Sequence, residues 1–300
     1  MEPFRHEQIH EFITTMNRRI FIKKGSILLA SGFLLRFAQG MPSRKNSWSL
    51  LHTNDFHSRF LPFPATHKRH ANQGGIARLT QLVNNLREQH EHVTLFDSGD
   101  VFQGTPYFNV FKGHPELDWM QRMQYDATTL GNHDFDMGVD HLFTLRKKYN
   151  TPTLLINYNF EQGSDLGVIQ PYKIIDRGPV KIGVTGISID LLGLQGETNR
   201  GSFEYFDPIE RLQEQVNFLR KNKNCDAVVV LSHLGFKYDS DKIDDVKLAE
   251  RTDGIDVILG GHTHTFLDEP LVLKNKSGKK VVINQAGWAG LKLGHLQFEY

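Results

Sequence analysis

Five short apolar runs in this chain each lead directly into a polar turn that carries Asp, Asn or His. The turns occupy residues 52–57 (HTNDFH), 97–100 (DSGD), 131–136 (GNHDFD), 232–235 (SHLG) and 260–264 (GGHTH). Apolar runs of this length are typical of buried strands, and in open α/β sheets ligands bind beyond the carboxyl ends of the strands. We therefore expect the five turns to converge on one site.

Longer segments with helical spacing alternate with the apolar runs. Between residues 75 and 87, apolar side chains recur at positions 76, 79, 82, 83 and 86, the spacing of one helix face. Helices are also expected over 115–123 and 208–220, the second with Asp207 as N-cap and Pro208 at its first position. Strands are expected over 47–51, 93–96, 126–130, 153–156, 173–175, 180–187, 227–231, 255–259 and 281–284. This alternation predicts an α/β fold with mostly buried strands. The polar loop from Pro62 to Gln73 is its best candidate for a mobile lid.

The first forty residues have the pattern of a twin-arginine export signal. Arg18 and Arg19 precede Phe21, and an apolar stretch of 11 residues, 25–35, follows. That stretch is shorter than a helix that spans a bilayer. The small residues near position 40 are typical of a signal-peptidase cleavage site. We expect a cleaved signal over 1–40 and a periplasmic or exported protein. An uncleaved membrane anchor is the alternative.

Charge and cysteine content exclude several classes of partner and bond. The formal net charge is +1, and without residues 1–40 the chain has 29 Lys and Arg against 31 Asp and Glu, or −2. A protein so close to neutrality does not bind nucleic acid or acidic membranes non-specifically. We therefore expect no nucleic-acid partner and no stable membrane binding after signal cleavage. Cys225 is the single cysteine, which excludes an internal disulfide, and we expect it to be a small buried side chain.

The five turns carry a set of side chains that favours metal ions. The candidate ligands are Asp55, His57, Asp100, Asn132, His233, His262 and His264. All are oxygen or nitrogen ligands without a thiolate, a set that suits Zn²⁺, Mn²⁺ or Fe. Seven ligands are too many for one four-coordinate ion but suit two divalent ions that share a carboxylate, about 3.5–4 Å apart. Such ions lower the pKa of a bound water to about 7, which makes hydroxide available at neutral pH.

The order of these motifs resembles that of the calcineurin-like metallophosphoesterases. The residues around these motifs are similar to those of the 5′-nucleotidase family within this group. The similar segments are HTNDFHSR (52–59), GGIARL (74–79), FDSGDVFQGTP (96–106), YDATTLGNHDFDMG (125–138), VLSHLG (230–235) and ILGGHTH (258–264). The resemblance covers roughly residues 47–300. It implies a four-layer αββα sandwich and a dimetal phosphoesterase domain over 41–300, with the site at the strand ends.

The resemblance also implies a role for each residue. The first metal would be held by Asp55, His57, His264 and the shared Asp100; the second by Asp100, Asn132, His233 and His262. His133 and Asn132 would face the substrate phosphate. His133 would stabilise its developing charge or assist the leaving oxygen, with Asp136 orienting the imidazole. Asp134 is interpreted as a supporting residue. Arg78 and Gln103 could line the site, but a helix-surface arginine and a loop amide are the simpler interpretations.

The resulting hypothesis is a 5′-nucleotidase in which metal-bound hydroxide attacks the phosphorus of a nucleoside monophosphate or another small phosphate ester. The alternatives are a 2′,3′-cyclic-nucleotide phosphodiesterase, a sulfur-ester hydrolase similar to the thiosulfohydrolases, and a metal-binding subunit without activity of its own. Full-length 5′-nucleotidases have a second domain that holds the base, and we expect residues 41–300 to contain only the catalytic domain. We expect a separate nucleotide-binding chain to supply the second domain, or else activity of this domain alone on small esters.

Overall fold

The computed structural model describes residues 21–23, 27–28, 47–160, 167–194, 196 and 203–299. A first sheet has the strand order β1 (Phe21–Lys23), β16 (Lys292–Glu299), β3 (Ser47–Thr53), β4 (Val93–Asp97), β5 (Ala127–Thr128), β6 (Thr153–Leu154) and β8 (Ile169–Gln170). From β3 to β8 neighbouring strands are parallel, whereas β16 is antiparallel to β3. The short strand β2 (Ile27–Leu28) also pairs with β16.

A second sheet has the order β14 (Leu271–Lys274), β15 (Lys280–Asn284), β13 (Val257–Gly260), β12 (Ala227–His233), β10 (Val180–Ser188) and β9 (Lys173–Arg177). Its four central strands are parallel, and both outer strands are antiparallel to their neighbours. A separate pair is formed by β7 (Tyr158–Phe160) and β11 (Phe203–Tyr205).

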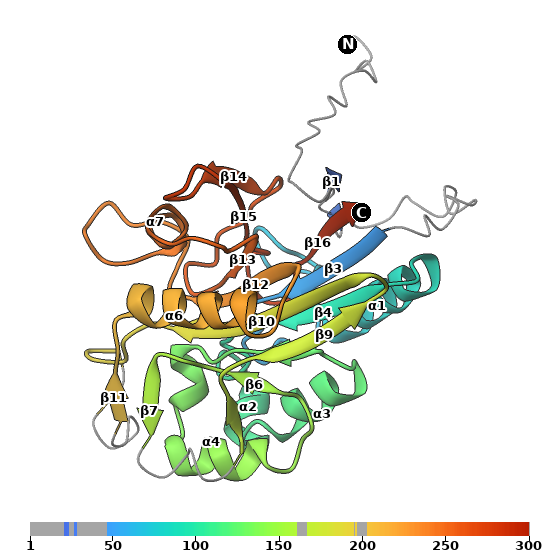
Figure 1. The fold of residues 1–300 in the computed structure, drawn as a ribbon. Helices are drawn as coiled ribbons and strands as arrows, with labels where there is room; N and C mark the ends of the chain where they lie inside the picture. The colour runs from blue at the N-terminus through green and yellow to red at the C-terminus, as the bar shows by residue number, and fades with distance from the viewer. Residues whose placement is uncertain are drawn as a thin grey trace.

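The two sheets stack face to face, and each is covered by helices on its outer face. Side chains alternate along the strands, so Leu50 and Phe96 face the second sheet while Leu51 and Leu95 face outward. The outer face of the first sheet packs against α1 (Ile76–Gln89), α3 (His114–Arg122) and α4 (Val139–Arg146). The outer face of the second packs against α6 (Pro208–Lys221) and α7 (Asp245–Arg251). Figure 1 shows α1 and α6 on opposite sides of the stacked sheets. The expected four-layer αββα sandwich is confirmed.

Most expected elements are present with small shifts of their ends. The helix expected over 208–220 is α6, and the Asp207 carboxylate accepts the backbone N–H groups of Ile209 and Glu210 as the cap requires. The strands expected over 126–130 and 153–156 are shorter, two residues each in β5 and β6. Three short helices, α2 (Pro106–Phe111), α4 and α7, and the strands β7, β8, β11, β14 and β16 were not foreseen. Cys225 is buried, as expected.

The expected export signal lies outside the described residues apart from 21–23 and 27–28. These two segments are the strands β1 and β2, and both pair antiparallel with β16. Among the described residues, no helix has the length and apolar character needed to cross a bilayer.

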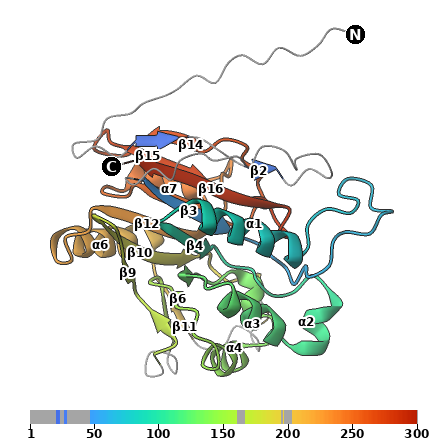
Figure 2. The same cartoon turned by 90° about the vertical axis from the view of Figure 1, so that its right-hand side faces the viewer.

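The loop from Pro62 to Gln73 is fixed at its base and projects from the molecule as the blue loop at the right of Figure 2. The Phe63 N–H donates to the Gln73 carbonyl, and the Asn72 N–H donates to the Phe63 carbonyl, at 2.8 and 3.0 Å. The Phe63 side chain is buried against Ala289 and Leu291. These contacts anchor the base of the loop, and lid motion of its tip stays a prediction.

Candidate metal centre

The carboxyl ends of the parallel strands in both sheets bring the seven candidate ligands together. The first sheet supplies Asp55 and His57 after β3, Asp100 after β4, and Asn132 in the 3₁₀ turn η1 (Asn132–Phe135) after β5. The second sheet supplies His233, the last residue of β12, with His262 and His264 after β13. The site therefore lies where the two sheets meet.

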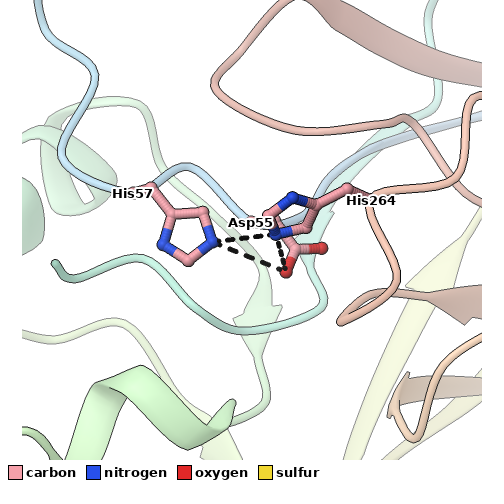
Figure 3. Close-up of side chains that lie close together, drawn as sticks. All are labelled: Asp55, His57 and His264. Carbon is pink, nitrogen blue, oxygen red and sulfur yellow. Dashed lines mark hydrogen bonds and ion pairs between the residues drawn. The ribbon is translucent and has the colours of Figure 1, made fainter. Parts of the chain in front are cut away.

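One group of ligand atoms consists of Asp55, His57 and His264. The two Nε2 atoms of His57 and His264 are 3.0 Å apart. The Oδ1 atom of Asp55 lies 3.3 Å from His264 Nε2 and 3.9 Å from His57 Nε2. Figure 3 shows the three side chains pointing at one another. This group contains three of the four ligands that the resemblance implies for the first metal.

The second group consists of Asp100, His233 and His262, with Asn132 beside it. His233 Nε2 lies 3.1 Å from Asp100 Oδ2, and His262 Nδ1 lies 2.8 Å from the amide oxygen of Asn132. Asp100 Oδ2 is also 3.9 Å from His57 Nε2 in the first group. Asp100 is therefore placed to serve both groups, as a shared carboxylate must.

The backbone at these ligands is strained. Asp55, His57 and Asp100 have φ angles of 50°, 51° and 56°, and His262 and His264 have 71° and 52°. Non-glycine residues rarely adopt the left-handed region, which costs of order 1–3 kcal/mol for each residue. Such conformations are concentrated at functional sites, where the surrounding structure holds them. Five of the seven candidate ligands are held in this way.

Backbone and side-chain partners orient the shared carboxylate and two of the imidazoles. The His133 backbone N–H donates to Asp100 Oδ1 at 2.7 Å. The Nδ1 atoms of His57 and His233 lie 3.2 and 2.6 Å from the carbonyl oxygens of Phe102 and Ser98. A carbonyl acceptor on the second ring nitrogen fixes the orientation of a ligating histidine.

Asp134 has the supporting role expected from the sequence. Its carboxylate accepts the backbone N–H groups of Gly131, Asp100 and Val101 at 2.8, 3.1 and 3.2 Å. It therefore ties the turn that carries Asn132 to the loop that carries Asp100. Burial raises the pKa of Asp134, and the positive charge of the buried Arg146 in α4 counteracts part of this rise. Sequence reasoning missed Arg146, which lies outside all the motifs.

The charges of neighbouring candidate ligands shift one another's pKa values. Burial alone would raise the pKa of Asp100, but the adjacent His233 holds it well below its usual range. Burial likewise opposes the charged form of His233, yet Asp100 and Asp55 raise its pKa to about 10. Burial and the neighbouring His233 lower the pKa of His262 to about 4. The buried carboxylates of Asp100 and Asp55 thus favour a positive charge between the two sheets.

The donor set fits two divalent ions. The buried Nε2 atom of His233 has no hydrogen-bond partner in the described part of the chain and faces carboxylate oxygens of Asp100 and Asp55. Facing imidazole nitrogens and carboxylate oxygens are the ligands of Zn²⁺, Mn²⁺ and Fe sites. Cations at these two points would satisfy the charges of both carboxylates.

His133 and Asp136 form a pair at the edge of the ligand groups. His133 Nδ1 lies 3.1 Å from Asp136 Oδ2, and the His133 ring meets the His57 ring edge-on at 5.4 Å. The hydrogen bond to Asp136 raises the pKa of His133. The imidazole is 39 % exposed, so a substrate can reach it.

Arg78 and Gln103 have local roles. The exposed Arg78 guanidinium donates to the Asn72 carbonyl in the 62–73 loop. The Gln103 side-chain oxygen accepts the Gly104 backbone N–H. Among the described residues, neither forms a hydrogen bond with a candidate ligand, which agrees with the simpler interpretation of both residues.

A family model described as calcineurin-like phosphoesterase matches residues 49–266. The match covers most of the chain and all seven candidate ligands. The chain belongs to the calcineurin-like phosphoesterases. Within this family it is similar to 5′-nucleotidases: it is 35 % identical to the snake venom 5′-nucleotidase of Crotalus adamanteus over 270 residues, and 33 % identical to the human 5′-nucleotidase over 299 residues.

The matches cover 83 % and 92 % of this phosphoesterase chain but only 44 % and 50 % of those relatives. A solved structure of the 5′-nucleotidase precursor from Thermus thermophilus superposes with a TM-score of 0.74 at 33 % identity, over 84 % of this chain and 51 % of that one. The chain therefore spans about half the length of the relatives it matches.

Proposed function

We propose that this chain is a 5′-nucleotidase that releases phosphate from nucleoside monophosphates with two divalent ions. The observation that carries the proposal is the convergence of two ligand groups from two sheets, with the His133–Asp136 pair beside them. The names of the similar proteins support a nucleotide as the substrate.

Each residue has a definite task in this proposal. Asp55, His57 and His264 would hold the first ion, Asn132, His233 and His262 would hold the second, and Asp100 would contribute to both. Two bound divalent ions would supply Lewis-acid polarisation of the phosphoryl oxygens and a lowered pKa for the attacking water. His133, kept protonated by Asp136, stabilises the charge on the phosphoryl group and donates a proton to the leaving nucleoside oxygen. The Asn132 amide also binds the phosphate.

The decisive test is phosphate release by the purified full chain loaded with Mn²⁺ or Zn²⁺. The substrates are a panel of nucleoside monophosphates, with 2′,3′-cyclic nucleotides and a thiosulfate ester as the competing classes. We expect phosphate from the monophosphates only, and loss of that activity in Asp100→Asn. Opening of the cyclic nucleotides to nucleoside monophosphates, or sulfate release from the sulfur ester, without phosphate release from the 5′-monophosphates contradicts the proposal, as does undiminished activity in Asp100→Asn.

A second unit that holds the base belongs to the same proposal. The chain spans about half the length of its relatives, and the described residues include two candidate ligand groups. We propose that a separate chain docks here and supplies nucleotide selectivity. Native-state mass measurement of the complex purified from its source checks this, and a bare monomer with full selectivity for one nucleotide counts against it.

Export by the twin-arginine route is proposed from the sequence pattern around Arg18 and Arg19. A fusion of residues 1–40 to a reporter that is active only after export should be active. Replacing both arginines by lysine should abolish the activity, because the paired arginine is the recognised feature of the signal. Replacing Lys23 and Lys24 by arginine is the control, and it should leave export intact.

A further inference from the structure

The histidine ligands of the first metal differ in what orients their rings. His57 has the Phe102 carbonyl oxygen 3.2 Å from its Nδ1 atom, and its side chain is only 10 % exposed. His264 directs Nε2 at the same point but is 38 % exposed. No hydrogen bond to His264 Nδ1 is found within the described residues. A solvent-exposed ligand without an acceptor is free to rotate, unless packing holds it.

The indole of Trp288 supplies that packing. Its ring lies parallel to the His264 imidazole, with an interplanar angle of 4° and a centroid separation of 5.4 Å. This offset stack covers one face of the imidazole and disfavours rotation about its side-chain bonds. Stacked aromatic pairs are worth about 0.5–1.5 kcal/mol beyond the area they bury.

Trp288 is itself held by the loop that carries Asp55. The Ala289 N–H donates to the Asp55 carbonyl at 2.7 Å, and the Asn54 side-chain amide donates to the Gly287 carbonyl at 2.6 Å. On its other side the indole meets the buried Phe63 ring edge-on at 5.6 Å. The indole is therefore held at a fixed place relative to Asp55, and its stack with His264 restricts the orientation of that imidazole.

We propose that Trp288 is a positioning residue for the first metal. It holds the His264 imidazole with Nε2 toward Asp55 and His57, and so takes the place of the carbonyl oxygens that orient His57 and His233. The inference rests on the two-ion function proposed above, and it assigns a role to a loop, 285–291, that follows the parallel strand β15.

The test compares metal binding in the full chain and in two variants, Trp288→Phe and Trp288→Leu. Zn²⁺ binding is measured by competition with a chelating dye, which resolves the dissociation constants of the two ions. We expect Trp288→Leu to bind one of its two ions roughly three- to ten-fold more weakly, the loss of one stacked pair, with the other ion unaffected. Trp288→Phe keeps a ring over His264 and should bind both ions nearly as the parent does.

Phe266→Leu is the matched control. The Phe266 ring stacks on His70, with 6.4 Å between the ring centroids, and not on a candidate metal ligand. It should bind both ions as the parent does. A second readout is the phosphatase rate against Mn²⁺ concentration. Excess metal should restore the rate of Trp288→Leu, whereas a purely structural defect would persist at saturating metal.

The outcomes separate the inference from the function on which it rests. A parent chain that binds two ions, together with Trp288→Leu binding both with unchanged affinity, overturns the role of Trp288 and leaves the proposed function standing. A parent chain that binds no ions overturns both. Equal weakening in Trp288→Leu and Trp288→Phe also overturns the inference, because it shows that the ring stack is not what matters.

Discussion

At the scale of single residues, the site depends on side chains that alter one another's charge. His133 is the clearest case, since its hydrogen bond to Asp136 raises its pKa while partial burial opposes the charged form. In the proposed mechanism His133 donates a proton, which it can do only below that pKa. Raising the pKa therefore extends the active protonated form toward higher pH.

Replacing Asp136 by Asn removes the carboxylate that stabilises the imidazolium. The pKa of His133 should fall, so the alkaline limb of the kcat–pH profile should move to lower pH. The kcat at neutral pH should fall by roughly a hundred-fold, the lower end of the range for a general acid. A pH series of kcat at saturating metal checks this. Asp140→Asn, an exposed carboxylate four residues on, is the control. An unmoved alkaline limb in Asp136→Asn would falsify the role of the pair.

The sequence identifies residues that belong to motifs and misses those that act through packing. Asp55, His233 and His262 were predictable because each follows an apolar run at a strand end. Trp288 also follows a strand, β15, but an aromatic residue between Gly287 and Ala289 looks like an ordinary core residue. The left-handed φ angles at Asp55, Asp100 and His264 could not be predicted either, because no glycine marks them and only the long-range contacts of the site hold them.

At the scale of elements, long periodic segments were predictable and short ones were not. α1 and α6 have 14 residues each and a clear apolar face. α7 has 7 residues and α2 has 6, too few for a periodic pattern to emerge. α4 is nearly as short, yet its last residue, Arg146, reaches beneath the loops of the metal centre, where it faces the charges of Asp134 and Asp97.

Replacing Arg146 by Met should destabilise the protein. The guanidinium is buried, none of its nitrogens has a hydrogen-bond partner in the described structure, and its charge favours the ionised form of the buried Asp134. The two groups form no direct ion pair among the described residues, so the cost should be smaller than the about 3–5 kcal/mol of a broken buried ion pair. Denaturant unfolding of the chelator-treated protein measures the change.

Two companion variants make the result specific. Arg122→Met removes an exposed arginine paired with Asp118, and it should leave the free energy of unfolding almost unchanged. Arg146→Met combined with Asp134→Asn removes both charges and should recover part of the loss. If Arg146→Met is as stable as the parent chain, the guanidinium is not needed to compensate Asp134.

At the scale of the whole molecule, the metal centre joins the two halves of the sandwich. Asp55, His57, Asp100 and Asn132 come from the first sheet, and His233, His262 and His264 come from the second. The apolar layer between the sheets, with Leu50 and Phe96 against Val229 and Leu231, holds them face to face. The resemblance predicted this architecture, whereas apolar periodicity alone predicted only an α/β protein, since it cannot say which strands share a sheet.

Bound metal should therefore stabilise the whole fold rather than one loop. An ion that binds only the folded state adds RT ln(1 + [L]/Kd), which is about 2.7 kcal/mol when its concentration is a hundred times Kd. The free energy of unfolding should rise by about this amount for each ion between chelator-treated and Zn²⁺-loaded protein. Asp55→Asn on the first sheet and His262→Gln on the second should each reduce the rise. His114→Gln, an exposed histidine that contacts Tyr149, should retain it. A rise that is lost only in the first-sheet variant would show that the ions stabilise one sheet and do not join the two.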